Sequence, residues 1–243
     1  MRVFGLLGKT LKHSFSKAYF TTKFEKQNIS NCSYENFELE SINELPHLLR
    51  NNPFLAGLNV TIPYKEEVIP FLHSYDEIVG EIKACNCIKI VDGELRGFNT
   101  DVIGFQQSLE KHLQPHHNKA LVLGTGGAAK AVLCALQRLR INYTEVSRSQ
   151  KPNTLTYDQL KKEHLQQHTM IINTTPAGMY PNTNDAPSVP YDFVTSRHLL
   201  FDLIYNPEKT LFLKKGEEKG ATIINGAEML LLQAEESWRI WNS

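Results

Sequence analysis

Short apolar runs of the kind that form buried strands alternate with helix-like stretches along most of the chain. This alternation favours an α/β fold with parallel strands. The strands it predicts cover residues 2–7, 56–60, 141–146, 171–172 and 199–203.

One pair of strands is predicted to be antiparallel. The segments 88–91 and 94–98 flank Asp92 and Gly93, and an Asp-Gly pair adopts the positive φ that a tight hairpin turn requires. The return strand leads directly to Asp101, which opens a helix whose apolar positions recur every three to four residues.

The most informative local pattern is a glycine-rich turn at 124–129, between an apolar strand at 120–123 and an apolar-striped helix at 130–139. This order fits the G-x-G-x-x-A pattern of dinucleotide-binding units, in which backbone N–H groups and a helix N-terminus hold a pyrophosphate. The alternative is an ordinary turn between a strand and a helix. The turn residues predicted to bind a cofactor are Gly124, Thr125, Gly126, Gly127 and Ala128.

The residues after the next predicted strand indicate whether NAD or NADP would be bound. NAD sites usually have an acidic residue there that holds the ribose diol, whereas an arginine suits the 2′-phosphate of NADP. Arg148 follows that strand between Ser147 and Ser149. Glu145 is the competing residue, but it stands one step too early for the strand end. Arg148 could also be an ordinary surface charge.

Composition restricts the classes of function. The 243 residues include 26 Lys and Arg and 26 Asp and Glu, a balance that disfavours nucleic acid as a partner. No apolar stretch approaches the ~18 residues of a membrane helix, and the N-terminus lacks a secretory signal. We therefore expect a cytoplasmic protein without a membrane partner. The four cysteines have no metal-ligand spacing, so no metal site is expected.

Polar residues gather at the ends of the predicted strands in the first hundred residues. Each has a simple explanation by itself: Ser16 or Asp101 could cap a helix, and Lys65 could be a solvated helix residue. Together they mark the strand-end edge where α/β proteins bind ligands. The clusters are Ser14 with Ser16; Asn59, Thr61 and Lys65; and Asn86 with Asp101.

In these clusters the chain resembles the shikimate dehydrogenase family, which interconverts 3-dehydroshikimate and shikimate with NADP(H). The run 59–65 is a highly specific signature. The chain departs from the family's usual residues at Lys17, Tyr19, Phe20, Cys87, Ser147 and Glu228, and none of these is assigned to catalysis. The matching segments are 13–16, 59–65, 86, 97–101, 124–129, 147–149, 173–179, 202–207 and 225–234.

The resemblance implies a two-domain α/β protein that is a monomer or a homodimer. A substrate-binding catalytic domain is expected over residues 1–101, joined by the C-terminal helix 226–243. A Rossmann-type, doubly wound NADP-binding domain is expected over 102–225. The active site is expected in the cleft between them, where hinge closure excludes water.

The resemblance also implies roles for single residues. Lys65 and Asp101 are the catalytic acid–base pair, with Lys65 either transferring the proton or acting as a fixed ammonium that stabilises the alkoxide. The implied substrate-binding residues are Ser14, Ser16, Thr61, Asn86, Tyr205 and Gln233. Besides the glycine-rich turn, the implied NADP contacts are Ser147, Arg148, Thr174, Leu203 and Gly226.

The implied function is NADP-dependent shikimate dehydrogenation in aromatic amino-acid biosynthesis. Three alternatives stay open: a sister enzyme that prefers quinate or accepts NAD, an enzyme of folate one-carbon units, and a nucleotide-binding regulatory module without catalysis. The paired serines and Asn86 favour a carboxylated polyol over a folate. The presence of Lys65 and Asp101 argues against the inactive module.

Overall fold

A computed structural model describes residues 1–11 and 14–243, so His13 of the matched segment 13–16 lies outside the described residues. The chain forms two compact units: a first unit of Met1–Thr100 with Ala234–Ser243, and a second unit of Asp101–Gln233. Each unit has its own six-stranded sheet. The predicted α/β class with two domains is confirmed.

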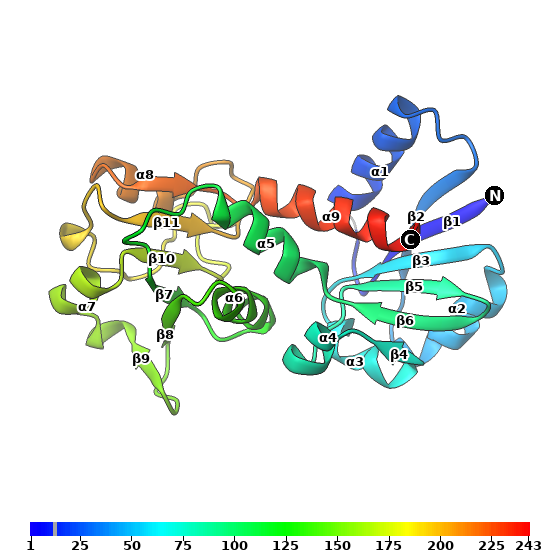
Figure 1. Ribbon diagram of the computed structural model, residues 1–243, viewed down its shortest axis with the longest axis horizontal. Helices are drawn as coiled ribbons and strands as arrows, with labels where there is room; N and C mark the ends of the chain where they lie inside the picture. Colours follow the sequence, from blue (N-terminus) through cyan, green and yellow to red (C-terminus); the bar gives the residue numbers. More distant parts are fainter. Residues whose placement is uncertain (12–13) are drawn as a thin grey trace. The chain divides into compact units, whose positions relative to one another are not determined.

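The first unit contains a mixed sheet in the order β2-β1-β3-β5-β6-β4. Strands β1, β2 and β3 run parallel to one another, whereas β5 pairs antiparallel with both β3 and β6 (Figure 1). Its strands are β1 (Arg2–Gly8), β2 (Cys32–Glu38), β3 (Leu55–Val60), β4 (Ser74–Tyr75), β5 (Cys87–Val91) and β6 (Glu94–Phe98). Its helices are α1 (Phe15–Lys26), α2 (Leu45–Asn51), α3 (Tyr64–Glu67) and α4 (Glu77–Ile82).

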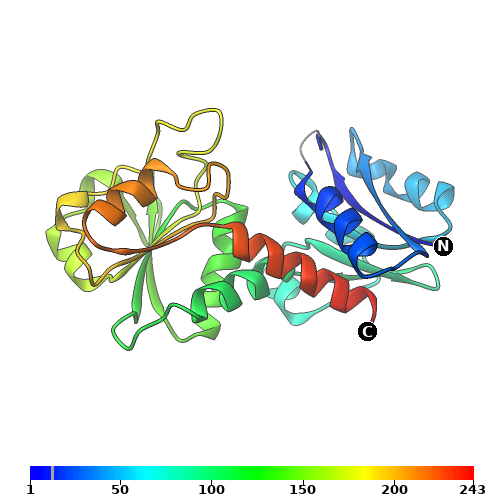
Figure 2. The ribbon, with the colours of Figure 1, turned by 90° about the horizontal axis from the view of Figure 1, so that it is seen from above.

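The two faces of this sheet have different cores. One face is aliphatic and packs Leu7 and Leu58 against Leu45 of α2. The other is aromatic and packs Phe4 against Phe20 of α1 and Trp241 near the C-terminus. Figure 2 shows α1 and α2 on opposite sides of the strands. Successive side chains of a strand point to opposite faces, so β1, β3 and β5 each contribute to both cores.

The second unit has an all-parallel sheet in the order β12-β11-β10-β7-β8-β9, the doubly wound arrangement of dinucleotide-binding domains. Its strands are β7 (Lys119–Leu123), β8 (Asn142–Ser147), β9 (Thr154–Thr156), β10 (Met170–Asn173), β11 (Leu199–Asp202) and β12 (Thr222–Ile224). Its helices are α5 (Thr100–Glu110), α6 (Gly127–Arg138), α7 (Lys162–Gln167), α8 (Leu211–Glu218) and the first part of α9 (Ala227–Trp241).

The division of the closing helix differs from the expected one, which gave residues 226–243 to the first domain. The first turns of α9 pack on α5, since a side chain at Gly104 would clash with the carbonyl of Met229 and Lys111 forms an ion pair with Glu228. The boundary accordingly falls between Gln233 and Ala234.

The predicted strands are confirmed as parts of β1, β3, β8, β10 and β11. The hairpin of β5 and β6 is also confirmed, with φ of 52° at Asp92 and 81° at Gly93. In residues 1–11 and 14–243, none of the helices has the length and apolar content that a bilayer-spanning helix needs.

Candidate active site

Ser14 and Ser16 lie at the N-terminus of α1. The hydroxyl of Ser14 caps the helix by accepting a hydrogen bond from the backbone N–H of Lys17 at 3.2 Å. Ser16 is buried, and its hydroxyl lies near the phenol of Tyr34 on β2. The helix cap is therefore Ser14, and Ser16 faces another polar group inside the first unit.

Thr61 and Lys65 follow the carboxyl end of β3. The backbone N–H of Thr61 donates to the carbonyl of Leu7 at 2.9 Å, and a Cβ at Gly8 would lie 2.6 Å from the Thr61 methyl carbon. Lys65 belongs to the single turn α3, where its carbonyl accepts the N–H of Cys85 at 2.7 Å. The segment that carries Lys65 is thus fixed both to β3 and to the residues just before Asn86.

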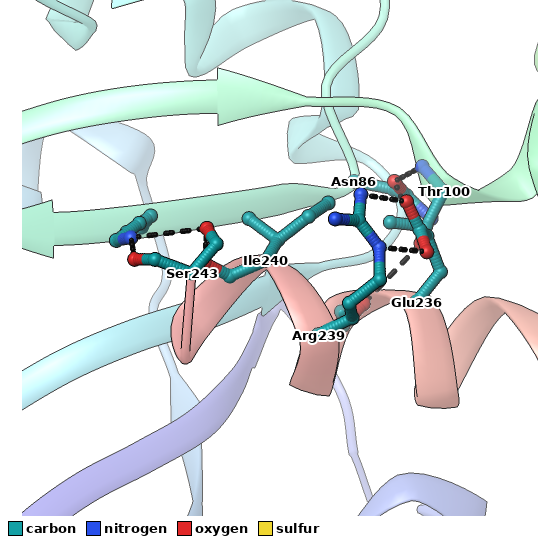
Figure 3. A network of polar contacts seen from close by, with 8 residues as sticks. Asn86, Thr100, Glu236, Arg239, Ile240 and Ser243 are labelled. Atoms are coloured by element: carbon teal, nitrogen blue, oxygen red, sulfur yellow. Dashed lines mark hydrogen bonds and ion pairs between the residues drawn. The ribbon is translucent and has the colours of Figure 1, made fainter.

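Asn86 directly precedes β5, the strand that lies between β3 and β6. Its carbonyl accepts the N–H of Val60 at 2.8 Å, and its own N–H donates to the carbonyl of Phe98 at 3.1 Å. Its side-chain Oδ1 accepts the backbone N–H of Thr100 at 2.6 Å, and its Nδ2 donates to the Thr100 hydroxyl at 3.0 Å (Figure 3). The first unit thereby brings Thr61, Lys65 and Asn86 to one edge of its sheet.

Three of the predicted catalytic and substrate-binding residues, Asp101, Tyr205 and Gln233, belong to the second unit. Asp101 lies in the first turn of α5, where the helix dipole favours a carboxylate. Tyr205 is exposed and follows β11, and Gln233 is buried in α9. The predicted catalytic pair Lys65 and Asp101 is therefore divided between the two units.

The glycine-rich turn connects β7 to α6, as predicted. Gly124 has φ of +107°, and a Cβ there would lie 2.7 Å from the Thr174 hydroxyl. By contrast, a Cβ at Gly126 or Gly127 would meet no atom of the described chain within 4 Å. Gly124 is thus required by the fold, whereas Gly126 and Gly127 leave space at the N-terminus of α6, where backbone N–H groups attract an anion.

Thr174, Leu203 and Gly226 lie at the carboxyl ends of β10 and β11 and before α9. Both the N–H and the hydroxyl of Thr174 donate to the carbonyl of Leu123, at 3.0 and 2.7 Å. The carbonyl of Leu203 lies so close to Gly226 that any side chain at 226 would clash with it. These contacts place the three residues on the same sheet edge as the glycine-rich turn.

The candidates for recognising the adenosine ribose differ in their place on β8. Glu145 is paired within the strand with Val122 and Thr154, two residues before the strand ends. Ser147 is the last strand residue and is buried, and its hydroxyl accepts the N–H of Ser149 at 3.4 Å. Arg148 follows and is exposed. Arg148, rather than Glu145, therefore stands beyond the strand end.

Lys151 is a candidate that the sequence pattern did not identify. Its Nζ donates to the hydroxyl of Thr125 in the glycine-rich turn at 2.7 Å. This contact adds a second cation to the same end of the sheet as Arg148. The available signal was a basic residue three positions after Arg148, but the sequence does not reveal that the loop folds back onto Thr125.

Asp202, at the end of β11, is a second group that was not singled out. Its carboxylate is wholly buried and accepts hydrogen bonds from the Thr210 hydroxyl at 2.6 Å, the Asn173 amide at 3.0 Å and the N–H of Ile204 at 3.1 Å. Burial raises its pKa to about 6, although these hydrogen bonds oppose the shift. Asp202 thus connects the loops that follow β10 and β11.

The buried cysteines are structural. Burial raises the pKa of the Cys85 thiol to about 12 and raises that of Cys87 as well, so neither is a reactive thiolate near neutrality. Within the described part of the chain, His, Cys, Asp and Glu side chains form no group of three or more that could ligate a metal ion.

Comparison with known proteins identifies the family. A model described as the shikimate dehydrogenase substrate binding domain matches residues 6–88, which lie within the first unit and include Ser14, Ser16, Thr61, Lys65 and Asn86. A shikimate dehydrogenase (NADP(+)) of Caldicellulosiruptor bescii is 38% identical over 258 residues, covering 99% of this chain and 89% of the relative. The chain belongs to the shikimate dehydrogenase family. It is therefore a member of a family of oxidoreductases.

Solved structures of similar proteins agree in fold. A shikimate 5-dehydrogenase from Thermus thermophilus, in complex with NADP(H) and shikimate, is 28% identical with a TM-score of 0.87, covering 99% of this chain and 93% of that chain. The 5-ketofructose reductase of a Gluconobacter species is 25% identical with a TM-score of 0.85, covering 99% of this chain and 92% of that chain. Proteins similar to this shikimate dehydrogenase homologue thus include enzymes of another substrate specificity.

Proposed function

We propose that this protein interconverts 3-dehydroshikimate and shikimate with NADP(H). The observation that carries the proposal is the convergence of Thr61, Lys65 and Asn86 at one edge of the first sheet. The neutral side chains of Thr61 and Asn86 suit the hydroxyls of a polyol. The ammonium of Lys65 suits the oxygen on the carbon that is reduced. The T. thermophilus relative, solved with shikimate and NADP(H), supports this choice of ligands.

Substrate recognition is assigned to neutral side chains. Ser14 and Ser16 hold the carboxylate together with Tyr205. The Ser14 hydroxyl accepts the N–H of Lys17 as the helix cap, and it retains its own proton for donation to a carboxylate oxygen. Thr61, Asn86 and Gln233 contact the ring hydroxyls. An amide nitrogen has two N–H groups, so Asn86 can donate one to Thr100 and the other to the substrate.

Lys65 and Asp101 are the proposed catalytic pair. Reduction of a ketone leaves an oxygen that gains charge and a proton, and Lys65 either donates that proton or stabilises the charge as a fixed ammonium. Asp101 orients the lysine. The two residues belong to different units, Lys65 to the first and Asp101 to the second.

NADP supplies or accepts the hydride when bound. The residues that fit it are the open N-terminus of α6 at Gly126 and Gly127, and the cations Arg148 and Lys151. The helix N-terminus suits the pyrophosphate, and the cations suit a 2′-phosphate. Backbone atoms of Leu203 and Gly226 would contact the nicotinamide end. We further expect the protein to act in the cytoplasm in aromatic amino-acid biosynthesis.

The test is formation of reduced nicotinamide, followed by its absorbance, with shikimate or quinate and with NADP or NAD. Turnover that requires shikimate and NADP supports the proposal. Preference for quinate or NAD assigns the protein to a sister specificity. Absence of turnover with tight NADPH binding favours a non-catalytic nucleotide-binding module.

A reductase of uncharged sugar ketones is the second candidate, because the Gluconobacter 5-ketofructose reductase shares the fold over nearly the whole chain. Such a substrate has no carboxylate. Ser14→Ala separates the two functions: it raises the KM of a carboxylated substrate and leaves that of a neutral sugar unchanged.

A further inference from the structure

Two polar side chains lie inside the aromatic core of the first unit without a role in the proposed site. Asn59 of β3 is 4% exposed and Ser237 of α9 is 0% exposed. Three of the buried neighbours of Ser237 on α9 are apolar, namely Ala234, Ile240 and Trp241, and the fourth is Gln233. A buried polar group costs free energy unless it is hydrogen-bonded, so an apolar pair would suffice if packing were the only requirement.

Asn59 and Ser237 are joined in one hydrogen-bonded chain. The Nδ2 of Asn59 donates to the Ser237 hydroxyl at 2.8 Å, and that hydroxyl lies 3.3 Å from the hydroxyl of Thr100. The Asn59 amide is held at its other end by the phenol of Tyr34, which donates to Oδ1 at 2.9 Å. Burial raises the pKa of Tyr34, so the phenol keeps the proton that it donates.

The chain of hydrogen bonds ends at the amide of Asn86. The Thr100 hydroxyl accepts from Nδ2 of Asn86, and the Thr100 backbone N–H donates to Oδ1 (Figure 3). A backbone nitrogen can only donate, so the amide of Asn86 has one orientation. Asn59 also donates more weakly to the Asn86 carbonyl, at 3.4 Å. Both the backbone and the side chain of Asn86 are thus connected to this network.

We propose that Asn59 and Ser237 are positioning residues for substrate binding, which hold Thr100 and through it the substrate-facing amide of Asn86. This inference rests on the proposed function, since it assigns the network to recognition of a polyol hydroxyl. All five residues of the network, Tyr34, Asn59, Asn86, Thr100 and Ser237, belong to the first unit. The cooperative chain fixes the amide before substrate arrives, so less ordering is required on binding.

The proposal predicts an effect on substrate affinity alone. Ser237→Ala removes the hydroxyl between Asn59 and Thr100, and we expect the KM for shikimate to rise about fivefold, the effect of one lost hydrogen bond. The kcat should change less than about twofold, because the interaction is made in both the ground state and the transition state. The KM for NADP should stay constant.

Two further variants make the test sharp. Ser237→Cys has a similar size but a weak donor, so its KM for shikimate should lie between those of the wild type and Ser237→Ala; it also serves if the alanine variant does not fold. Ser108→Ala is the matched control: Ser108 is equally buried, and its hydroxyl has no hydrogen-bond partner among the described residues. It should leave all three kinetic constants unchanged.

The outcomes separate the two hypotheses. Absence of shikimate turnover by the wild type overturns the proposed function, and the inference with it. Normal wild-type turnover with an unchanged KM for shikimate in both Ser237 variants overturns the inference alone. An equal rise in the KM values for shikimate and NADP would also contradict it, because it would indicate a general disturbance rather than positioning of Asn86.

Discussion

The cores of the two units differ in where polar groups are placed. In the second unit the central strands β7, β10 and β11 are apolar except at their ends, where Lys119, Asn173 and Asp202 stand, and the candidate cofactor contacts lie in turns beyond the strands. In the first unit, polar side chains such as Asn59 and Ser237 stand within an aromatic core and lead to Asn86.

The difference follows from what each unit is proposed to bind. A pyrophosphate is recognised by backbone N–H groups at a helix N-terminus, which requires glycines and a fixed turn but few side chains. A polyol acid is recognised through several hydroxyls at defined positions, which requires oriented side chains supported from behind. Substitutions in the first unit should therefore change substrate kinetics, and substitutions in the glycine-rich turn or just beyond β8 should change cofactor kinetics.

The largest effect is expected for Lys65→Ala in the first unit. Loss of the proposed proton donor or oxyanion-stabilising ammonium should lower kcat about 10³-fold. NADPH affinity, measured by fluorescence titration, should be unchanged because the cofactor contacts lie in the other unit. Lys26→Ala, an exposed lysine at the end of α1, should retain full turnover. Near-normal kcat for Lys65→Ala would refute the assigned role.

The next effect concerns the stability of the second unit and its pH dependence. The pKa of Asp202 is raised from 3.8 to about 6 in the folded protein, so the folded state binds a proton more tightly than the unfolded state. Its contribution to stability is therefore greatest below about pH 4 and is lost as the pH rises to about 6. The change is at most about 3 kcal/mol.

Asp202→Asn should remove this pH dependence while retaining the acceptor oxygen for Asn173 and Ile204. The measurement is urea unfolding of the wild type and the variant at several pH values between about 4 and 7. The difference in unfolding free energy between the two proteins should change across that range. Parallel curves would show that Asp202 titrates alike in the folded and unfolded chains.

A smaller effect is expected for the cations beyond β8. Arg148→Ala should raise the KM for NADP about 30-fold at low salt, through loss of a charge-assisted contact to the 2′-phosphate. The KM for NAD, which lacks that phosphate, should be unchanged, and Lys151→Ala should act in the same direction but less strongly. Lys214→Ala, on the exposed surface of α8, is the control. Equal effects on NADP and NAD would contradict this assignment.

The smallest effect is expected for Gly127→Ala, which tests whether this glycine is needed for cofactor binding or for folding. A methyl group at Gly127 meets open space, and alanine favours a helix over glycine by up to about 1 kcal/mol. Gly127→Ala should thus leave thermal stability equal or slightly higher, yet raise the KM for NADP about tenfold because the methyl group occupies the anion space. A lower melting temperature would indicate that the glycine serves the fold.

Strongly patterned elements were predictable from the sequence, and weakly patterned ones were not. Strands β7 and β10 are runs of buried apolar residues, and the β5–β6 hairpin has its Asp-Gly turn. Strand β2 was not predicted, because it lies at the sheet edge and Tyr34 is its only fully buried residue among the seven. The other six side chains of β2 are partly or fully exposed and mostly polar, so the segment has too few apolar residues for a strand pattern.

The candidate functional residues also fall into two groups, those that a local motif predicts and those that it does not. Ser14, Lys65 and Arg148 follow recognisable motifs at strand ends or a helix start. Lys151, Asp202 and Ser237 do not, because their partners Thr125, Asn173 and Asn59 are distant in sequence and chosen by the fold. The two alternatives for Ser16 were likewise decided by geometry: Ser14 caps α1, and Ser16 contacts Tyr34.

The sequence by itself determined the α/β class, the two-domain organisation, the glycine-rich turn and the family, because these depend on local periodicity, turn chemistry and short motifs. Only the tertiary structure decided the mixed order of the first sheet, the division of α9 between the units and the buried network that leads to Asn86. These features depend on contacts between residues far apart in the chain, and such contacts are selected by packing and hydrogen-bond satisfaction rather than by any local pattern.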